Sequence, residues 1–226
     1  MTLPPPWTLR FLLTEIQSPE MGRKCGIVDR RPLDPPAVVQ LQAFIVTDPG
    51  TAIEHTMEIQ DYEWAPLEIL RRKDLNSAGY LCETELFMLD DAGNSFGASA
   101  TNYVNSTHDL IGSKVVESAI IKYHGRQCLV FPFTDLSSKA TGNFFLGYKF
   151  FDVLQLGGQA VGSVQAQCWG NSFRVYSSKD TPPMNPSTAL TKSLADAGLR
   201  VHQRSQRRER GKRKRPSDDD SAASQS

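Results

Sequence analysis

The chain has 226 residues, of which 39% are hydrophobic, and its 25 Lys and Arg residues balance 25 Asp and Glu residues. This length suits one large domain, and no apolar run approaches the roughly 18 residues of a membrane span, so no membrane partner is expected. Residues 1–199 hold 16 cationic and 21 acidic side chains (net −5), and residues 200–226 hold 9 and 4 (net +5). Nucleic-acid binding would therefore need a local patch or the C-terminal segment.

Most of the chain has the pattern of short β-strands. An extended, Pro-rich lead-in over residues 1–7 comes first. The expected strands are 8–16, 37–46, 80–89, 115–124, 127–133, 142–153, 161–169 and 173–177. The segment 51–78 alternates poorly and is interpreted as a variable loop region, with room for a short strand or helix. The small, polar segment 94–112 is interpreted as a long connection. Aromatic residues on both faces of 142–153 predict a central strand packed on each side.

One helix is expected, over residues 185–198. Asn185 or Ser187 can cap it, and Gly198 suits its exit. Its apolar face would hold Leu190, Leu194 and Ala197. Many short strands with one late helix predict a mainly-β sandwich with Greek-key-like connections. Apolar periodicity ends at about Val201, so residues 203–226 are expected to be a disordered basic and acidic tail.

The stretch 22–41 carries a cluster of cations on a stiffened loop. The cations are Arg23, Lys24, Arg30 and Arg31, and three prolines follow before the next strand. Guanidinium groups match phosphates and guanine edges, so this loop suits a polyanion. Two alternatives stay open: a solvated turn with ordinary surface cations, or an arginine that pairs with Asp29 or Asp34 and only braces the loop. A second cluster at 71–73 is more simply explained as a solvated loop.

Motifs for catalysis or metal binding are not found. The four cysteines form no C-x-x-C pair, which argues against a zinc site and favours free thiols in a reducing compartment. The four histidines lack metal-ligand spacing, and no nucleophile elbow accompanies His108 and Asp109. We therefore expect no enzyme, no metal and no cofactor.

Three stretches resemble the velvet family of fungal regulators, in the family's order. They are CGIVDRRPLDPPAVVQL at 25–41, FPFTDLSSKATGNFFLGYKFFDV at 131–153 and FRVYSSKDTPPMNPSTALTKSLADAGLRV at 173–201. The resemblance implies a velvet domain over residues 8–202. It also implies an immunoglobulin-like β-sandwich, similar to the Rel-type DNA-binding domains that read DNA from loops at one end.

The resemblance further implies a sequence-specific transcription regulator that binds double-stranded DNA, controls development, sporulation and secondary metabolism, and dimerises with itself or other velvet-domain proteins. It would lie in the nucleus and shuttle with the cytoplasm. Arg30 and Arg31 match the family's basic loop position by position, whereas Arg23 and Lys24 lie outside the closest match. The alternative is an interaction subunit that dimerises and leaves the DNA contact to its partner.

The tail carries two further candidate sites. The compact basic run Lys212, Arg213, Lys214 and Arg215 predicts a signal for a nuclear import receptor, or else a nonspecific nucleic-acid arm. Ser217 precedes three aspartates, an arrangement that suits an acid-directed kinase. A phosphate there would add about −1.5 to −2 charges beside the basic run. An unmodified tail is the alternative.

Overall fold

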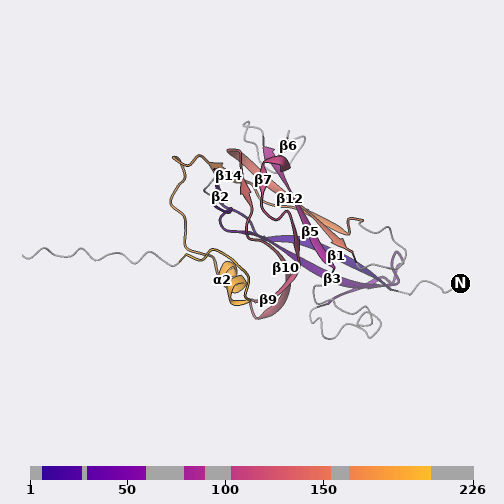
Figure 1. Cartoon of the computed structure of the whole chain (residues 1–226). Coiled ribbons are helices and arrows are strands. Elements are labelled where there is room, and N and C mark those ends of the chain that lie inside the picture. Colours follow the sequence, from indigo (N-terminus) through magenta and orange to yellow (C-terminus); the bar gives the residue numbers. More distant parts are fainter. Residues whose placement is uncertain (1–6, 27–29, 60–78, 90–102, 154–162, 205–226) are drawn as a thin grey trace, which may run out of the picture.

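The computed structural model describes residues 7–26, 30–59, 79–89, 103–153 and 163–204, which form two main β-sheets and a helix on the C-terminal side (Figure 1). The first sheet is antiparallel, with the order β1-β3-β10-β9 and with β4 also paired to β3. Its strands are β1 (Trp7–Gln17), β3 (Ala37–Thr47), β4 (His55–Glu58), β9 (Ala119–Tyr123) and β10 (Arg126–Phe133).

The second sheet has the order β2-β14-β12-β5-β6, with β13 beside β12 and β8 beside β5. Its strands are β2 (Met21–Arg23), β5 (Tyr80–Leu89), β6 (Tyr103–Asn105), β8 (Val115–Glu117), β12 (Gly142–Asp152), β13 (Ala166–Trp169) and β14 (Phe173–Tyr176). A small third sheet pairs β7 (Leu110–Ile111) with β11 (Ser137–Ser138), and the 3-10 turn η1 (Thr107–Asp109) precedes β7. Only β2 and β14 run parallel among these described pairs.

The core lies between the inner faces of the two main sheets. Alternate residues of β12 are fully buried there, and Phe150 contacts an aromatic ring from each of two facing strands. Its centroid lies 5.0 Å from that of Phe11 on β1 and 5.9 Å from that of Phe131 on β10. The predicted mainly-β sandwich with a C-terminal helix is therefore confirmed.

Most expected strands match observed ones within a few residues, but two regions differ. The expected strand 115–124 is two strands in different sheets, because the chain crosses between sheets at Ser118, whose N–H donates to the Tyr80 carbonyl at 3.2 Å. Neither glycine nor proline marks this crossing. The expected connection 94–112 contains β6 and β7 in its described part. The short strand β4 lies within 51–78, whose residues 60–78 fall outside the description.

The helix α2 (Ala189–Asp196) is shorter than expected and begins at a different cap. Its N-cap is Thr188, whose hydroxyl oxygen accepts a hydrogen bond from the Thr191 N–H at 3.0 Å. The expectation of Asn185 or Ser187 was therefore wrong, and Ser187 instead contacts the C-terminal segment. The helix packs on the outer face of the first sheet, beside β9 (Figure 1). Leu190 and Leu194 of the helix pack there against four residues of the sheet, Val38, Ile121, Cys128 and Val130.

Candidate nucleic-acid interface

The loop predicted to contact DNA leaves the second sheet after β2 and returns beside the same strand. The Asp34 N–H donates to the Met21 carbonyl at 2.8 Å, and the Met21 N–H donates back to the Asp34 carbonyl at 2.9 Å. Leu33 is buried and lies against Gly22, where a Cβ atom would come within 2.7 Å of a Leu33 methyl group. The two limbs of the loop are therefore joined at their base by backbone pairing and close packing.

Each limb is also attached to the segment that contains β11. On the outgoing limb, the Cys25 N–H donates to the Ser138 carbonyl at 2.7 Å. On the returning limb, the Ser137 hydroxyl donates to the Arg31 carbonyl at 3.0 Å. Because these anchors lie on both sides of residues 27–29, which the structure does not describe, the cations next to them project from a fixed base. From the sequence we expected the three prolines to stiffen this loop. Much of its support comes instead from hydrogen bonds to residues far away in sequence.

All four predicted DNA contacts lie on this loop, with different exposure. Lys24, Arg30 and Arg31 are exposed, and Arg23 is half-buried at the end of β2. The Lys24 N–H donates to the Tyr176 carbonyl at 2.9 Å, which holds the start of the loop against β14. The arrangement presents positive charge to solvent on a supported backbone.

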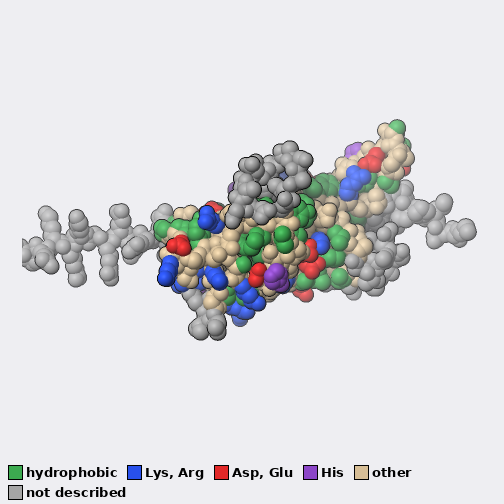
Figure 2. Space-filling view, turned by 90° about the horizontal axis from the view of Figure 1, so that it is seen from above, with side chains coloured by type: hydrophobic (Ala, Val, Ile, Leu, Met, Phe, Trp, Pro, Cys, Tyr) green, Lys and Arg blue, Asp and Glu red, His purple; other side chains and the backbone are tan. Residues whose placement is uncertain are grey.

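The fold adds cations that sequence reasoning did not select. Arg174 on β14 is exposed, and its guanidinium lies 5.3 Å from the centroid of the Tyr176 ring, while Lys139 and Lys179 are exposed just after β11 and β14. Several Lys and Arg side chains gather at one end of the molecule (Figure 2). The alternation of apolar and polar residues in FRVY, the sequence of β14, was enough to predict that Arg174 lies on an outer face. It could not have shown that β14 lies next to β2.

Asp34 pairs with an arginine from outside the loop. Its Oδ1 lies 2.5 Å from Nη2 of Arg204, and both side chains are mostly buried. Burial raises the pKa of Asp34 above its ordinary value, and the Arg204 guanidinium offsets part of that rise. The ion pair described for Asp34 is therefore with Arg204 and not with an arginine of the loop. Asp29, the other acidic partner considered, falls outside the described residues.

A second surface lies on the outer face of the second sheet and is aromatic. Phe87 and Phe145 stack with centroids 5.2 Å apart and are nearly buried, whereas Tyr103 and Trp169 are each 50% exposed. The Trp169 ring lies over Gly147, where a Cβ atom would come within 2.6 Å of it. We call these four aromatic residues the outer aromatic face. Half-exposed Trp and Tyr side chains are typical of surfaces that bind proteins.

Two predicted sites fall outside the described residues, the basic run at 212–215 and Ser217, and so does the cluster at 71–73 that was interpreted as a solvated loop. Within the described part, no group of three or more His, Cys, Asp or Glu side chains could hold a metal ion. The four cysteines are free thiols. The helical part of the described chain offers no segment with the length and apolarity of a membrane span.

Comparison with known proteins gives a consistent match. The velvet factor family model matches residues 11–106 and 91–208. A probable velvet family sexual development regulator of Schizophyllum commune is 37% identical over 211 residues, which cover 86% of this chain and 72% of the relative. A probable velvet family sexual development regulator of Laccaria bicolor is 32% identical over 91% of this chain and 73% of the relative.

Shorter or weaker similarity reaches proteins with other names. A velvet complex subunit 2 of Gibberella moniliformis is 32% identical over 102 residues, which cover 42% of this chain and 23% of that protein. The family model spans most of the sandwich, the loop and α2, and the two longer matches cover 86% and 91% of the chain. The chain therefore belongs to the velvet family.

Proposed function

We propose that this chain is a transcription regulator of development, including sporulation, and of secondary metabolism, and that it binds double-stranded DNA through the loop that carries Arg30 and Arg31. The observation that carries the proposal is the exposure of Lys24, Arg30 and Arg31 on a loop whose two limbs are hydrogen-bonded to separate segments. The names of its relatives as sexual development regulators support the biological role.

The physics of the loop favours a polyanion as its ligand. A supported backbone loses less conformational entropy on binding than a free loop does. Arginine forks can contact phosphates or guanine edges in pairs of hydrogen bonds. Because residues 1–199 have a net charge of −5, this part of the chain as a whole does not attract DNA, and binding needs this local gathering of cations or the basic C-terminal segment.

The test is an Arg30→Ala/Arg31→Ala double variant of the full chain, measured by fluorescence anisotropy with a duplex enriched from a random pool by the wild-type protein. If the arginines read bases, each loss should cost about 1–3 kcal/mol and relax sequence preference. If they touch only phosphates, affinity should fall uniformly and the salt slope should shrink by about one per residue.

A matched control removes the same charge elsewhere. Arg10 on β1 and Arg126 on β10 are exposed, so Arg10→Ala/Arg126→Ala should change DNA affinity much less than the loop variant does. Equal losses in both double variants would show a general charge effect rather than a contact at the loop. A wild-type chain with no measurable DNA affinity would exclude DNA binding by the chain alone.

The second candidate function is that of an interaction subunit, and the outer aromatic face favours it. Tyr103 and Trp169 are half-exposed on a rigid sheet, and a relative is named a velvet complex subunit. The partner would be a second velvet chain, either identical or related. Light scattering at tens of micromolar, with a pull-down of partners, tests this function, and a monomer that captures no velvet protein would contradict it.

The proposal extends to the nucleus through the C-terminal run Lys212–Arg215. Replacement of these four residues with alanine should reduce nuclear accumulation of a fluorescent fusion, in cells that lack velvet partners able to carry it in. Ser217 is the associated regulatory site, where a phosphate would weaken contact with an acidic receptor groove. Mass spectrometry of the native protein across growth conditions tests it, and consistently unmodified Ser217 would end this part of the proposal.

A further inference from the structure

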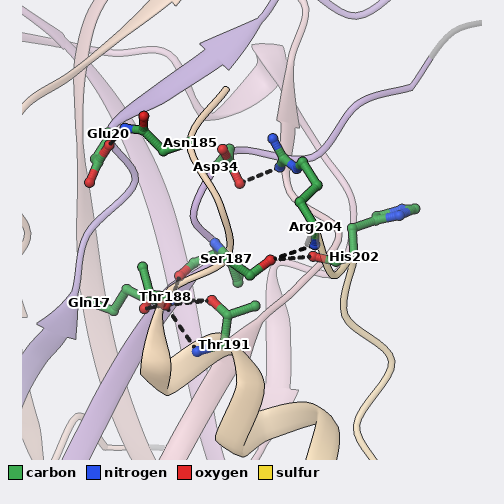
Figure 3. Close-up of polar contacts among 10 residues, drawn as sticks. Gln17, Glu20, Asp34, Asn185, Ser187, Thr188, Thr191, His202 and Arg204 are labelled. Carbon is green, nitrogen blue, oxygen red and sulfur yellow. Dashed lines mark hydrogen bonds and ion pairs between the residues drawn. The ribbon is translucent and has the colours of Figure 1, made fainter. Parts of the chain in front are cut away.

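Arg204 is held in one place by main-chain and side-chain contacts (Figure 3). Its N–H donates to the Ser187 hydroxyl oxygen at 2.8 Å, and its carbonyl accepts from the Ser187 N–H at 3.2 Å. Its Nη2 lies 2.5 Å from Asp34 Oδ1, and its Nη1 is buried with no hydrogen-bond partner among the described residues. The guanidinium is therefore directed at Asp34, with Nη1 buried.

Asp34 is equally constrained from the other side. Its carbonyl accepts hydrogen bonds from the N–H groups of Glu20 and Met21, both at 2.9 Å, where the basic loop begins and ends. Its carboxyl group therefore has a fixed place beside the loop, only a few residues after Arg30 and Arg31. A second carboxyl, that of Glu20, lies near enough to oppose ionisation of Asp34. An unpaired charge on Asp34 would reduce the positive potential of the loop.

We infer that Arg204 is a positioning residue for DNA binding: by neutralising Asp34, it preserves the positive potential of the loop that carries Arg30 and Arg31. The inference rests on the proposed function and adds to it a residue 170 positions away in sequence from the one that it neutralises. It also makes the start of the C-terminal segment part of the DNA-binding unit, through an ion pair rather than through a DNA contact.

The test is a double-mutant cycle in the full chain, read by DNA affinity and its salt dependence with the duplex selected by the wild-type protein. The variants are Arg204→Met, Asp34→Asn and the two together, since methionine keeps part of the apolar stem of arginine. We expect Arg204→Met to weaken binding about threefold to tenfold, within the usual coupling of residues in one charge network. We expect Asp34→Asn not to weaken it. We expect the double variant to bind as the wild type does, because the pair carries no net charge in either.

The cycle separates positioning from direct contact. If Arg204 touched DNA, the double variant would lose that contact although the net charge of the pair is unchanged, so it would bind more weakly than the wild type, with a salt slope lower by about one. That result would overturn the inference, as would unchanged binding by Arg204→Met or weaker binding by Asp34→Asn. Arg204→Lys, which keeps the charge, should bind nearly as the wild type does.

Two further outcomes keep the test decisive. If circular dichroism shows that Arg204→Met does not fold, the neutral double variant is compared with the wild type, and weaker binding by the double variant overturns the inference. A wild-type chain that binds no duplex overturns both this inference and the proposed function. A wild-type chain that binds DNA, with Arg204→Met equal to it, overturns only the inference.

Discussion

The two faces of strand β12 carry aromatic residues in alternation, but they meet different surroundings. On the inner face, Phe144, Tyr148 and Phe150 are at most 1% exposed between the two main sheets. On the outer face, Phe145 is nearly buried, but Trp169 over it is 50% exposed. Aromatic alternation alone therefore does not tell whether a face is a core or a binding surface. The difference comes from the first sheet, which covers the inner face of β12.

The comparison also separates stability from recognition. The inner face is enclosed, so its side chains cannot move to fill a lost volume. The outer aromatic face is open to solvent on one side, so Trp169 and Tyr103 can shift. We expect inner-face changes to affect mainly the free energy of unfolding, and outer-face changes to affect mainly association with a partner.

The largest effect is expected at Phe150. Phe150→Ala should lower the free energy of unfolding by about 3–5 kcal/mol, because it opens a cavity among Phe11, Phe131 and Tyr80. Urea denaturation followed by circular dichroism measures it. Phe145→Ala is the matched control on the other face and should cost clearly less, since half-exposed neighbours can collapse into the space. Equal costs would mean that the outer aromatic face is as rigid as the core.

An intermediate effect is expected at Gly147, where the outer aromatic face packs most closely. A Cβ atom there would lie 2.6 Å from the Trp169 ring and 2.9 Å from the Phe87 ring, so Gly147→Ala should cost about 1–3 kcal/mol through overpacking. Urea denaturation measures this cost. In a Trp169→Ala background the same substitution should cost less, because only the contact with Phe87 remains. Additive costs in the double variant would show that contact with Trp169 is not the cause.

A smaller effect on stability is expected at Trp169 itself. Because its side chain is 50% exposed, Trp169→Ala should lower the free energy of unfolding by only about 1 kcal/mol. If the outer aromatic face binds a velvet partner, the same variant should weaken that association by a larger factor, measured by analytical ultracentrifugation. Val164→Ala, at another exposed apolar residue, serves as the control. Unchanged association would assign the partner surface elsewhere.

The smallest effect is a dependence of the free energy of unfolding on pH. It comes from Glu15, whose carboxyl group is hydrogen-bonded to Tyr148 of the inner face. The Tyr148 hydroxyl donates to Glu15 at 2.6 Å, and burial raises the pKa of Glu15 above its ordinary value near 4.5, although hydrogen bonds offset part of the rise. As pH rises, Glu15 therefore loses its proton at a lower pH in the unfolded chain than in the folded chain. The contribution of Glu15 to the free energy of unfolding should therefore fall as pH rises from about 4.5 through the folded pKa.

Glu15→Gln removes this titration and isolates it. The free energy of unfolding of the wild type minus that of Glu15→Gln should decrease as pH rises from about 4.5, and should be constant at pH values above the folded pKa. Urea denaturation at a series of pH values measures the difference. A difference that increases with pH would show that hydrogen bonds to the ionised carboxylate outweigh the cost of its burial.

The amino-acid sequence alone determined where most strands lie and which residues of a strand share a face. The period-two pattern of 142–153 correctly placed Phe144, Tyr148 and Phe150 on one face, because strand geometry turns local alternation directly into sidedness. The cations of the loop were equally visible, since they are neighbours in sequence. Their exposure is now established, whereas their contact with DNA stays a prediction.

Only the tertiary structure decided the features that join residues far apart in sequence. The crossing at Ser118, the arrangement of Arg174 beside β2 and the pairing of Arg204 with Asp34 all depend on which strands become neighbours and in which register. Thr188 became the cap although Ser187 stands next to it, because Ser187 is engaged by the returning C-terminal segment. Sequence periodicity reports the direction of a side chain along its own strand or helix, but not the element that packs against it.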